Sequence, residues 1–316
     1  MATATRPQPL PTRSGADAEN DAGWRKVDLP GRGTTYAFDR PHPSPSAPTV
    51  VLLHGWTATG SLNWATTMTA LADRFRVVAL DHRGHGRGIR EYDTFTLEDC
   101  ADDAIALLDV LGVSTAIFVG YSMGGPIAQL IWRRHADRVD GLVLCATAAD
   151  FTTTPHQRRV VGALDQMQRV GQVVPPSVRR HMARPLVTRM VSDPDKRDEL
   201  LDAVSGYTQR TIHEAGQVAR TFRSTGWVGE IDVPVVVVVT RRDRVVRPLR
   251  QRQLARAIPG AHTITVDAGH LAAFTSPGVI ADAVVTGCDQ IASRIVLPTR
   301  RHRFGRSISR LFRARR

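Results

Sequence analysis

Residues 116–135 read AIFVGYSMGGPIAQLIWRRH, and this stretch decides the fold. Its first part, AIFVGYS, is a short apolar and β-branched run that favours a buried strand, and MGGPIAQLIWRRH follows with a helical pattern. Between them, Gly120-Tyr121-Ser122-Met123-Gly124 has the form GxSxG, in which the glycines let a strand turn sharply into a helix. The stretch therefore predicts a strand–turn–helix unit with Ser122 at its apex.

The alternation of short β-branched runs with longer helical patterns continues on both sides of this unit. The segments are TVVLLHG, a helix near 62–73, FRVVALD, a helix near 97–111, GLVLCAT, PVVVVVT at 234–240, a helix near 248–257, HTITVD at 262–267 and a helix near 277–294. This order predicts an α/β fold with a mostly parallel sheet of eight-stranded type and helices on both faces. A hairpin is predicted over 24–38, and Asp99, Asp102 and Asp103 are expected on the solvent side of the helix near 97–111.

Changes in composition divide the chain into four regions. Residues 1–22 are rich in proline and polar groups and are predicted to be a disordered leader. The strand pattern stops over 151–230, where helix-like segments with proline breaks predict a helical cap inserted into the core. The core itself is expected to consist of residues 23–150 and 231–296, and residues 297–316 form a basic tail.

Much of the net charge of +12 lies in the tail, which has eight arginines and no acidic residue between Arg300 and Arg316. Because the charge is local, it does not indicate a specific nucleic-acid partner. Large apolar residues alternate with these arginines at roughly helical spacing: Phe304, Ile308, Leu311 and Phe312. This pattern suggests weak contact with an anionic membrane surface, and a disordered solubilising tail is the alternative.

The three cysteines, Cys100, Cys145 and Cys288, have neither CxxC nor Cys/His ligand spacing. We therefore expect no disulfide framework, no metal site and a reducing, cytoplasmic location, peripheral at the inner membrane surface if the tail binds there. No apolar run near 18 residues and no export-signal core is found in the sequence. The sequence does not indicate an oligomeric state.

Five landmarks, read together, carry a family resemblance. They are HGW at 54–56, DHRGHG at 81–86, GYSMGG at 120–125, Asp243 and Gly269-His270. In this order they resemble the landmarks of the α/β-hydrolase superfamily, and the chain is identified as a serine esterase/lipase-like member. The landmarks span about 220 residues, and their joint order is more specific than any one motif.

The resemblance implies a role for five residues. Ser122 would be the nucleophile, His270 the base and Asp243 the acid that orients the histidine, in the chain order Ser, Asp, His of this fold. The backbone amides of Met123 and Trp56 would form the oxyanion hole, and the helix that begins after Ser122 adds positive potential there.

Several alternatives stay open at this stage. Asp150 is the fallback for the acid, and Asp232 and Asp267 rank below it. Thr240 stands where family members usually have glycine. His54 resembles the histidine that braces the oxyanion loop in the family, while His82 and His85 are expected to shape the DHRGHG loop rather than bind metal.

The implied chemistry is acyl transfer, because relatives that make an alkyl-enzyme ester have aspartate where Ser122 stands. The first hypothesis is hydrolysis of small-molecule carboxylic esters with small or medium acyl groups, with no metal or organic cofactor. Two alternatives use the same three residues: a carbon–carbon bond hydrolase and a cofactor-free haloperoxidase-like perhydrolase. A non-catalytic binding protein of the same fold ranks below them because the full set of residues is present.

Overall fold

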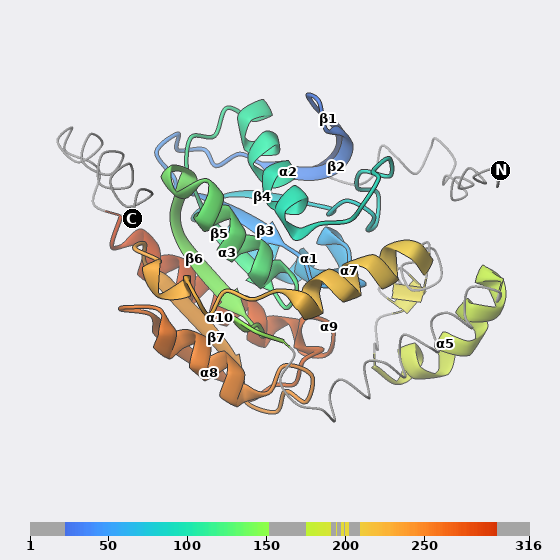
Figure 1. Cartoon of the computed structure of the whole chain (residues 1–316). Helices are drawn as coiled ribbons and strands as arrows, with labels where there is room; N and C mark the ends of the chain where they lie inside the picture. Colours follow the sequence, from blue (N-terminus) through green and yellow to red (C-terminus); the bar gives the residue numbers. More distant parts are fainter. Residues whose placement is uncertain are drawn as a thin grey trace.

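The computed structural model describes residues 23–151, 175–190 and 209–295, together with residues 194, 197, 198, 200 and 201. The predicted leader and basic tail lie outside these residues. Helices α5 (Pro176–Met190) and α7 (Gln209–Thr221) fall in the region where the sequence predicts an inserted cap, and both lie at the right of the sheet in Figure 1. The chain connects β6 to β7 through this region.

Eight strands form one sheet, as predicted. They are β1 (Trp24–Leu29), β2 (Gly33–Arg40), β3 (Thr49–Leu53), β4 (Arg76–Leu80), β5 (Ala116–Tyr121), β6 (Val139–Cys145), β7 (Val235–Thr240) and β8 (His262–Val266). Their order across the sheet is β1-β2-β4-β3-β5-β6-β7-β8. The predicted hairpin is the antiparallel pair β1–β2, and β2 also runs antiparallel to β4. All other pairs are parallel, so the carboxyl ends of β3 to β8 meet at one edge.

Helices cover both faces of the sheet (Figure 1). The core helices are α1 (Gly60–Leu71), α2 (Leu97–Val110), α3 (Gly124–Arg134), α8 (Pro248–Ala257), α9 (Ala272–Thr275) and α10 (Pro277–Ala292), with 3₁₀ turns at Ala136–Arg138 and Val228–Glu230. Two threonines fix helix starts: Thr59 accepts from the Leu62 N–H at 3.1 Å, and Thr96 accepts from the Asp99 N–H at 2.9 Å. The Thr59 cap explains why α1 begins two residues before the predicted start.

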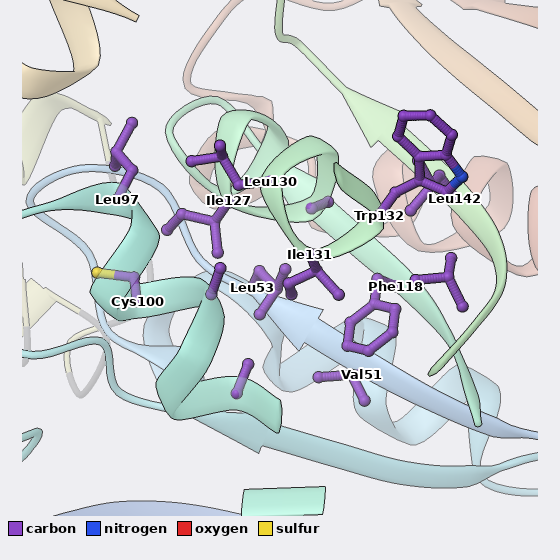
Figure 2. Close-up of a cluster of buried hydrophobic side chains, with 14 of the residues drawn as sticks. Val51, Leu53, Leu97, Cys100, Phe118, Ile127, Leu130, Ile131, Trp132 and Leu142 are labelled. Atoms are coloured by element: carbon purple, nitrogen blue, oxygen red, sulfur yellow. The ribbon is translucent and has the colours of Figure 1, made fainter. Parts of the chain in front are cut away.

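Side chains of each central strand alternate between two apolar clusters. Val51 and Leu53 of β3 point into the cluster covered by α2, α3 and α8, and Figure 2 shows them there with Phe118 of β5. Val50 and Leu52 point to the opposite cluster, which α1 and α10 cover. Because both faces are buried there, β3, β5 and β7 are buried along their whole length rather than alternating with exposed polar residues. This explains the continuous runs of β-branched residues in the sequence.

The acidic face of α2 corrects one expectation. Asp103, predicted on the solvent side, is 2% exposed. Both of its oxygens bind the buried Arg83 guanidinium, at 2.7 and 2.8 Å, and Arg32 also contacts it. A carboxylate without this partner would be too costly to bury, so the arginine of the DHRGHG loop decides the position of Asp103.

The three cysteines, on which the expectation of a reducing location is based, lie in the interior of the protein. Cys100, Cys145 and Cys288 are buried free thiols. Burial raises the pKa of the Cys145 thiol and that of Cys288 well above their ordinary values, which keeps both protonated. Among the described residues, no helix combines the length and the apolar composition needed to cross a bilayer.

Candidate active site

Ser122 lies at the turn between β5 and α3, in the left-handed region of backbone conformation with φ of 51°. This conformation is uncommon for a residue with a side chain and is held by its surroundings. The Ser122 N–H donates to the Cys145 carbonyl at 2.9 Å, and the Gly125 N–H donates to the Ser122 carbonyl at 3.0 Å. A Cβ atom on Gly120 would collide with the Gly124 carbonyl, and one on Gly124 would collide with the Leu53 carbonyl. Both glycines are therefore required by close packing.

Three predicted residues form one chain of hydrogen bonds at the carboxyl edge of the sheet. The Ser122 Oγ lies 3.0 Å from His270 Nε2, and His270 Nδ1 lies 2.8 Å from Asp243 Oδ2. Ser122 follows β5, Asp243 follows β7 and His270 follows β8, so three parallel strands deliver them to the same edge. The geometry allows His270 to accept the serine proton at Nε2 while its Nδ1–H donates to the carboxylate.

The carboxylate of Asp243 is fully buried, whereas 13% of the His270 side chain is exposed. Asp243 Oδ1 accepts from the backbone N–H groups of Val245 and Val246, both at 2.8 Å. The adjacent arginines do not neutralise it, because Arg241 and Arg242 instead bind Asp267. Backbone donors thus stabilise a buried negative charge that faces the histidine.

The other candidate acids have different partners. Asp150 forms an ion pair with Arg223 at 3.1 Å. Asp232 accepts from the Trp132 indole N–H at 3.1 Å. Asp267 forms ion pairs with Arg241 and Arg242. Of the four aspartates considered from the sequence, the structure therefore places Asp243 against His270.

The loop from β3 to α1 passes beside the serine. A Cβ on Gly55 would lie 3.5 Å from the Ser122 Cβ, and the Gly55 N–H donates to Asn63 Oδ1 at 3.0 Å. Trp56 follows on this loop, and Met123 stands at the N-terminus of α3. The two backbones predicted to form the oxyanion hole thus flank the serine from two elements.

Three buried histidines lie behind this loop. His54 Nδ1 donates to the Gly55 carbonyl at 2.8 Å, and its Nε2 accepts from the His82 backbone N–H at 3.0 Å, which ties the β3 loop to the β4 loop. The rings of His54 and His82 are 4.2 Å apart, and that of His85 lies 5.4 Å from His54. Burial lowers the pKa of His54 to about 4 and that of His85 to about 3, and it also lowers the pKa of His82. All three are neutral near pH 7, as the bracing role of His54 requires.

Helices α5 and α7, in the region predicted to be a cap, lie against residues on either side of the site. Gly216 of α7 packs against the Trp56 indole, where a Cβ would lie 2.8 Å from the ring. Val187 of α5 belongs to a small apolar cluster with Leu62 of α1, and Phe274 packs against this cluster. Helix α7 therefore contacts the loop that carries Trp56, and α5 packs near α1 and near α9, the short helix that follows His270.

The structure also brings in residues that the sequence analysis did not assign to the site. The Tyr121 hydroxyl donates to the His270 carbonyl at 2.7 Å, joining the serine turn to the histidine loop. Thr240, noted in the sequence only as a departure from glycine, donates to Asp243 Oδ2 at 2.9 Å, and Gln251 donates to the same oxygen at 3.1 Å. In the sequence, only the position of Thr240, three residues before Asp243, indicates that it could contact this acid. Gln251 lies on the next helix, and its contact with Asp243 has no local sequence pattern.

Comparisons with known proteins agree with this architecture. A family model described as the alpha/beta hydrolase fold matches residues 48–277. A protein named as a carbamate hydrolase in Agrobacterium fabrum strain C58 is 30% identical over 240 residues, 73% of this chain and 89% of that protein. The 41% identical stretch shared with the protein of the same description in Caulobacter sp. strain K31 spans 38% of that protein.

Two further similarities concern an esterase and a lactonase. The pimeloyl-[acyl-carrier protein] methyl ester esterase of Chromobacterium violaceum is 30% identical over 224 residues, 68% of this chain and 83% of that protein. The crystal structure of the enol-lactonase from Burkholderia xenovorans LB400 superposes with a TM-score of 0.70 at 25% identity, covering 84% of this chain and all of that one.

Proposed function

Because the chain belongs to the α/β-hydrolase family, we propose that it is a serine hydrolase that cleaves carboxylic esters of small or medium acyl groups through an acyl-enzyme on Ser122. The observation that carries this proposal is the hydrogen-bonded chain from Ser122 through His270 to Asp243, with distances of 3.0 and 2.8 Å. A serine without a base is a weak nucleophile, and this arrangement supplies the base.

The proposed first step is acylation. His270 Nε2 takes the Ser122 proton as Oγ attacks the ester carbonyl, and the Asp243 carboxylate stabilises the imidazolium through Nδ1–H. The carbon–oxygen bond to the alcohol then breaks, and the leaving alcohol receives the proton from His270. Water attacks the acyl-enzyme with His270 again as base, which releases the acid and restores Ser122.

The negative oxygen formed at each step needs donors beside the serine. We assign this role to the N–H groups of Met123 and Trp56, which flank Ser122 from α3 and from the β3 loop. Met123 precedes the first turn of α3, so the helix dipole adds positive potential at the same point.

Covalent labelling tests the nucleophile. A fluorophosphonate should form one adduct on Ser122 of the wild-type protein and none on a Ser122→Ala variant. No adduct on the wild type, or equal labelling of both proteins, would contradict the proposal.

A substrate panel tests the bond that is cleaved. p-Nitrophenyl esters from acetate to decanoate should be hydrolysed faster than an N-unsubstituted aryl carbamate and a vinylogous diketone. The carbamate is included because a relative is named as a carbamate hydrolase. The diketone is included because a carbon–carbon bond hydrolase can use the same three residues. Perhydrolysis is measured beside them as peracid formation from hydrogen peroxide and acetate. Faster turnover of the carbamate or the diketone would replace the ester assignment and leave the serine mechanism in place.

The basic tail is the subject of a separate proposal, weak contact with an anionic membrane surface. Its support is the sequence alone, in which arginines alternate with large apolar residues over 297–316. Full-length protein should pellet with anionic liposomes more than a variant ending at residue 298. Equal pelleting would refute the contact.

A further inference from the structure

Thr240 and Gln251 form a buried pair behind the proposed acid. Thr240 is the last residue of β7, Gln251 lies in the first half of α8, and both are 0% exposed. The Thr240 hydroxyl donates to Asp243 Oδ2 at 2.9 Å, and Gln251 Nε2 lies 3.1 Å from the same oxygen. This is the carboxylate oxygen that also accepts from His270, so the pair acts on the atom that faces the base.

The orientation of the Gln251 amide follows from its other partners. Its Oε1 accepts from the Thr240 backbone N–H at 2.9 Å, and its Nε2 donates to the Val246 carbonyl at 2.7 Å. The reversed amide would set two donors against each other at Thr240 and two acceptors at Val246. One Gln251 N–H therefore donates to Val246, and the other faces both Thr240 Oγ1, 2.9 Å from Nε2, and Asp243 Oδ2, 3.1 Å from Nε2.

The geometry points to Thr240 and Gln251 as positioning residues that fix the Asp243 carboxylate and hold part of its charge, which sets how strongly it acts on His270. This inference rests on the proposed function of the same three residues. Backbone donors fill Oδ1, and without the pair Oδ2 would be held by His270 alone among the described residues. A buried carboxylate with fewer donors would concentrate its charge on the histidine N–H and could rotate away from it.

Among the described residues, His270 is the only charged or titratable side chain that pairs with Asp243. Arg241 and Arg242 bind Asp267 on the outer side of the loop, and Arg244 is exposed. The buried Tyr121 donates to the His270 carbonyl rather than to the ring. Within the described part of the chain, Thr240, Gln251 and His270 are therefore the side chains that hydrogen-bond to Oδ2.

A Thr240→Val variant tests the role because it keeps the shape of the side chain and removes the donor. We expect kcat/KM on a p-nitrophenyl ester to fall about tenfold, mostly in kcat, as for the loss of one hydrogen bond to a charged group. The acid limb of the pH profile should move to higher pH by about half a unit. The reason is that a carboxylate that accepts one hydrogen bond fewer holds the proton of the protonated histidine more tightly. Thr240→Ser keeps the hydroxyl donor, so both values should stay near those of the wild type. Gln251→Met should have the same effect as Thr240→Val.

Ser224→Ala is the matched control. Ser224 is also 0% exposed, and its hydroxyl donates to Gln129 Oε1 at 2.6 Å without contacting Asp243. This variant loses a comparable buried hydroxyl, so it should lower the urea midpoint like Thr240→Val and leave the pH profile unchanged. If the acid limb shifts as much in Ser224→Ala as in Thr240→Val, the shift comes from general destabilisation of the fold, and the inference is overturned.

A measurement without turnover separates this inference from the proposed function. The low-field proton resonance of His270 Nδ1–H should move in Thr240→Val and in Gln251→Met and stay in place in Thr240→Ser and Ser224→Ala. If the resonance behaves in this way while no substrate is hydrolysed, the positioning role stands and the proposed hydrolase activity fails. If it stays in place in folded Thr240→Val and Gln251→Met and their pH profiles match the wild type, the positioning role is wrong.

Discussion

The buried histidines should make the fold sensitive to mild acid. In the unfolded chain these rings bind protons near their ordinary pKa of 6.5, whereas the folded-state pKa is about 4 for His54 and about 3 for His85. At pH values between the folded-state pKa values and 6.5, the unfolded state binds more protons than the folded state. The free energy of unfolding therefore falls as the pH is lowered below 6.5 and keeps its full value above it. Burial also lowers the pKa of His82, which adds to the effect in the same direction.

The size of the effect follows from these shifts. At pH 5, linkage gives a loss of about 2 kcal/mol for each of His54 and His85, about 4 kcal/mol together, with His82 adding to this. A typical domain has about 5–15 kcal/mol of stability, so the loss is a large fraction of the total. Burial raises the pKa of Asp81, which contributes in the opposite direction near its own titration range.

Urea unfolding at pH 7.5, 6.0 and 5.0 measures this dependence. His82→Phe should reduce the slope by up to about 1.4 kcal/mol per pH unit, one proton's worth. It should cost little at pH 7.5, because neither His82 ring nitrogen has a hydrogen-bond partner within the described part of the chain. His262→Gln, at an exposed position, should leave the slope unchanged. A total loss below about 1 kcal/mol between pH 7.5 and 5.0 would refute the reasoning, since linkage requires more.

Three further predictions concern the acid, a buried ion pair and the turn. Asp243→Asn should lower kcat by about 10⁴-fold with little change in fold, as the loss of a carboxylate partner to the base does, while Asp150→Asn should stay within a few-fold in the same assay; loss of turnover in only the second variant would move the acid to Asp150. Arg83→Met should cost about 3–5 kcal/mol in urea unfolding because it leaves the Asp103 carboxylate buried and short of its main partner. Gly124→Ala should also lower stability by more than about 3 kcal/mol, because the added Cβ meets the Leu53 carbonyl; an unfolding midpoint near that of the wild type would show that the turn can adjust.

The regular elements could be predicted because their signals are local. The runs that became β3, β5 and β7 are buried along their whole length since helices cover both faces of the sheet. The GxSxG turn was equally local, because its glycines are required by contacts within five residues and with the neighbouring strand. The order Ser122, Asp243, His270 then follows from the order of the strands that precede them.

Features that depend on side chains from distant segments could not be predicted. Asp103 follows the spacing of a solvent-facing residue, yet Arg83 and Arg32, 20 and 71 residues away in sequence, pair with it in the interior. Thr240 looked like a departure from a family pattern until Gln251 on the next helix completed its hydrogen bonds. In both cases a polar group is buried because a partner reaches it in three dimensions, and a linear pattern does not record that partner.

The spacing of the proposed site along the chain has a consequence for the newly made protein. Ser122 and His270 are 148 residues apart, and the region that contains α5 and α7 is synthesised between them. At about 5–20 residues per second, the ribosome needs roughly 7–30 s to travel from the serine to the histidine. The nascent chain therefore carries a serine with no base for this interval. A chain that stalls or is cut before β8 would lack His270, the proposed base, and also α10, which covers one face of the sheet. Completing the proposed site would then require the missing carboxyl-terminal segment rather than a change at the serine.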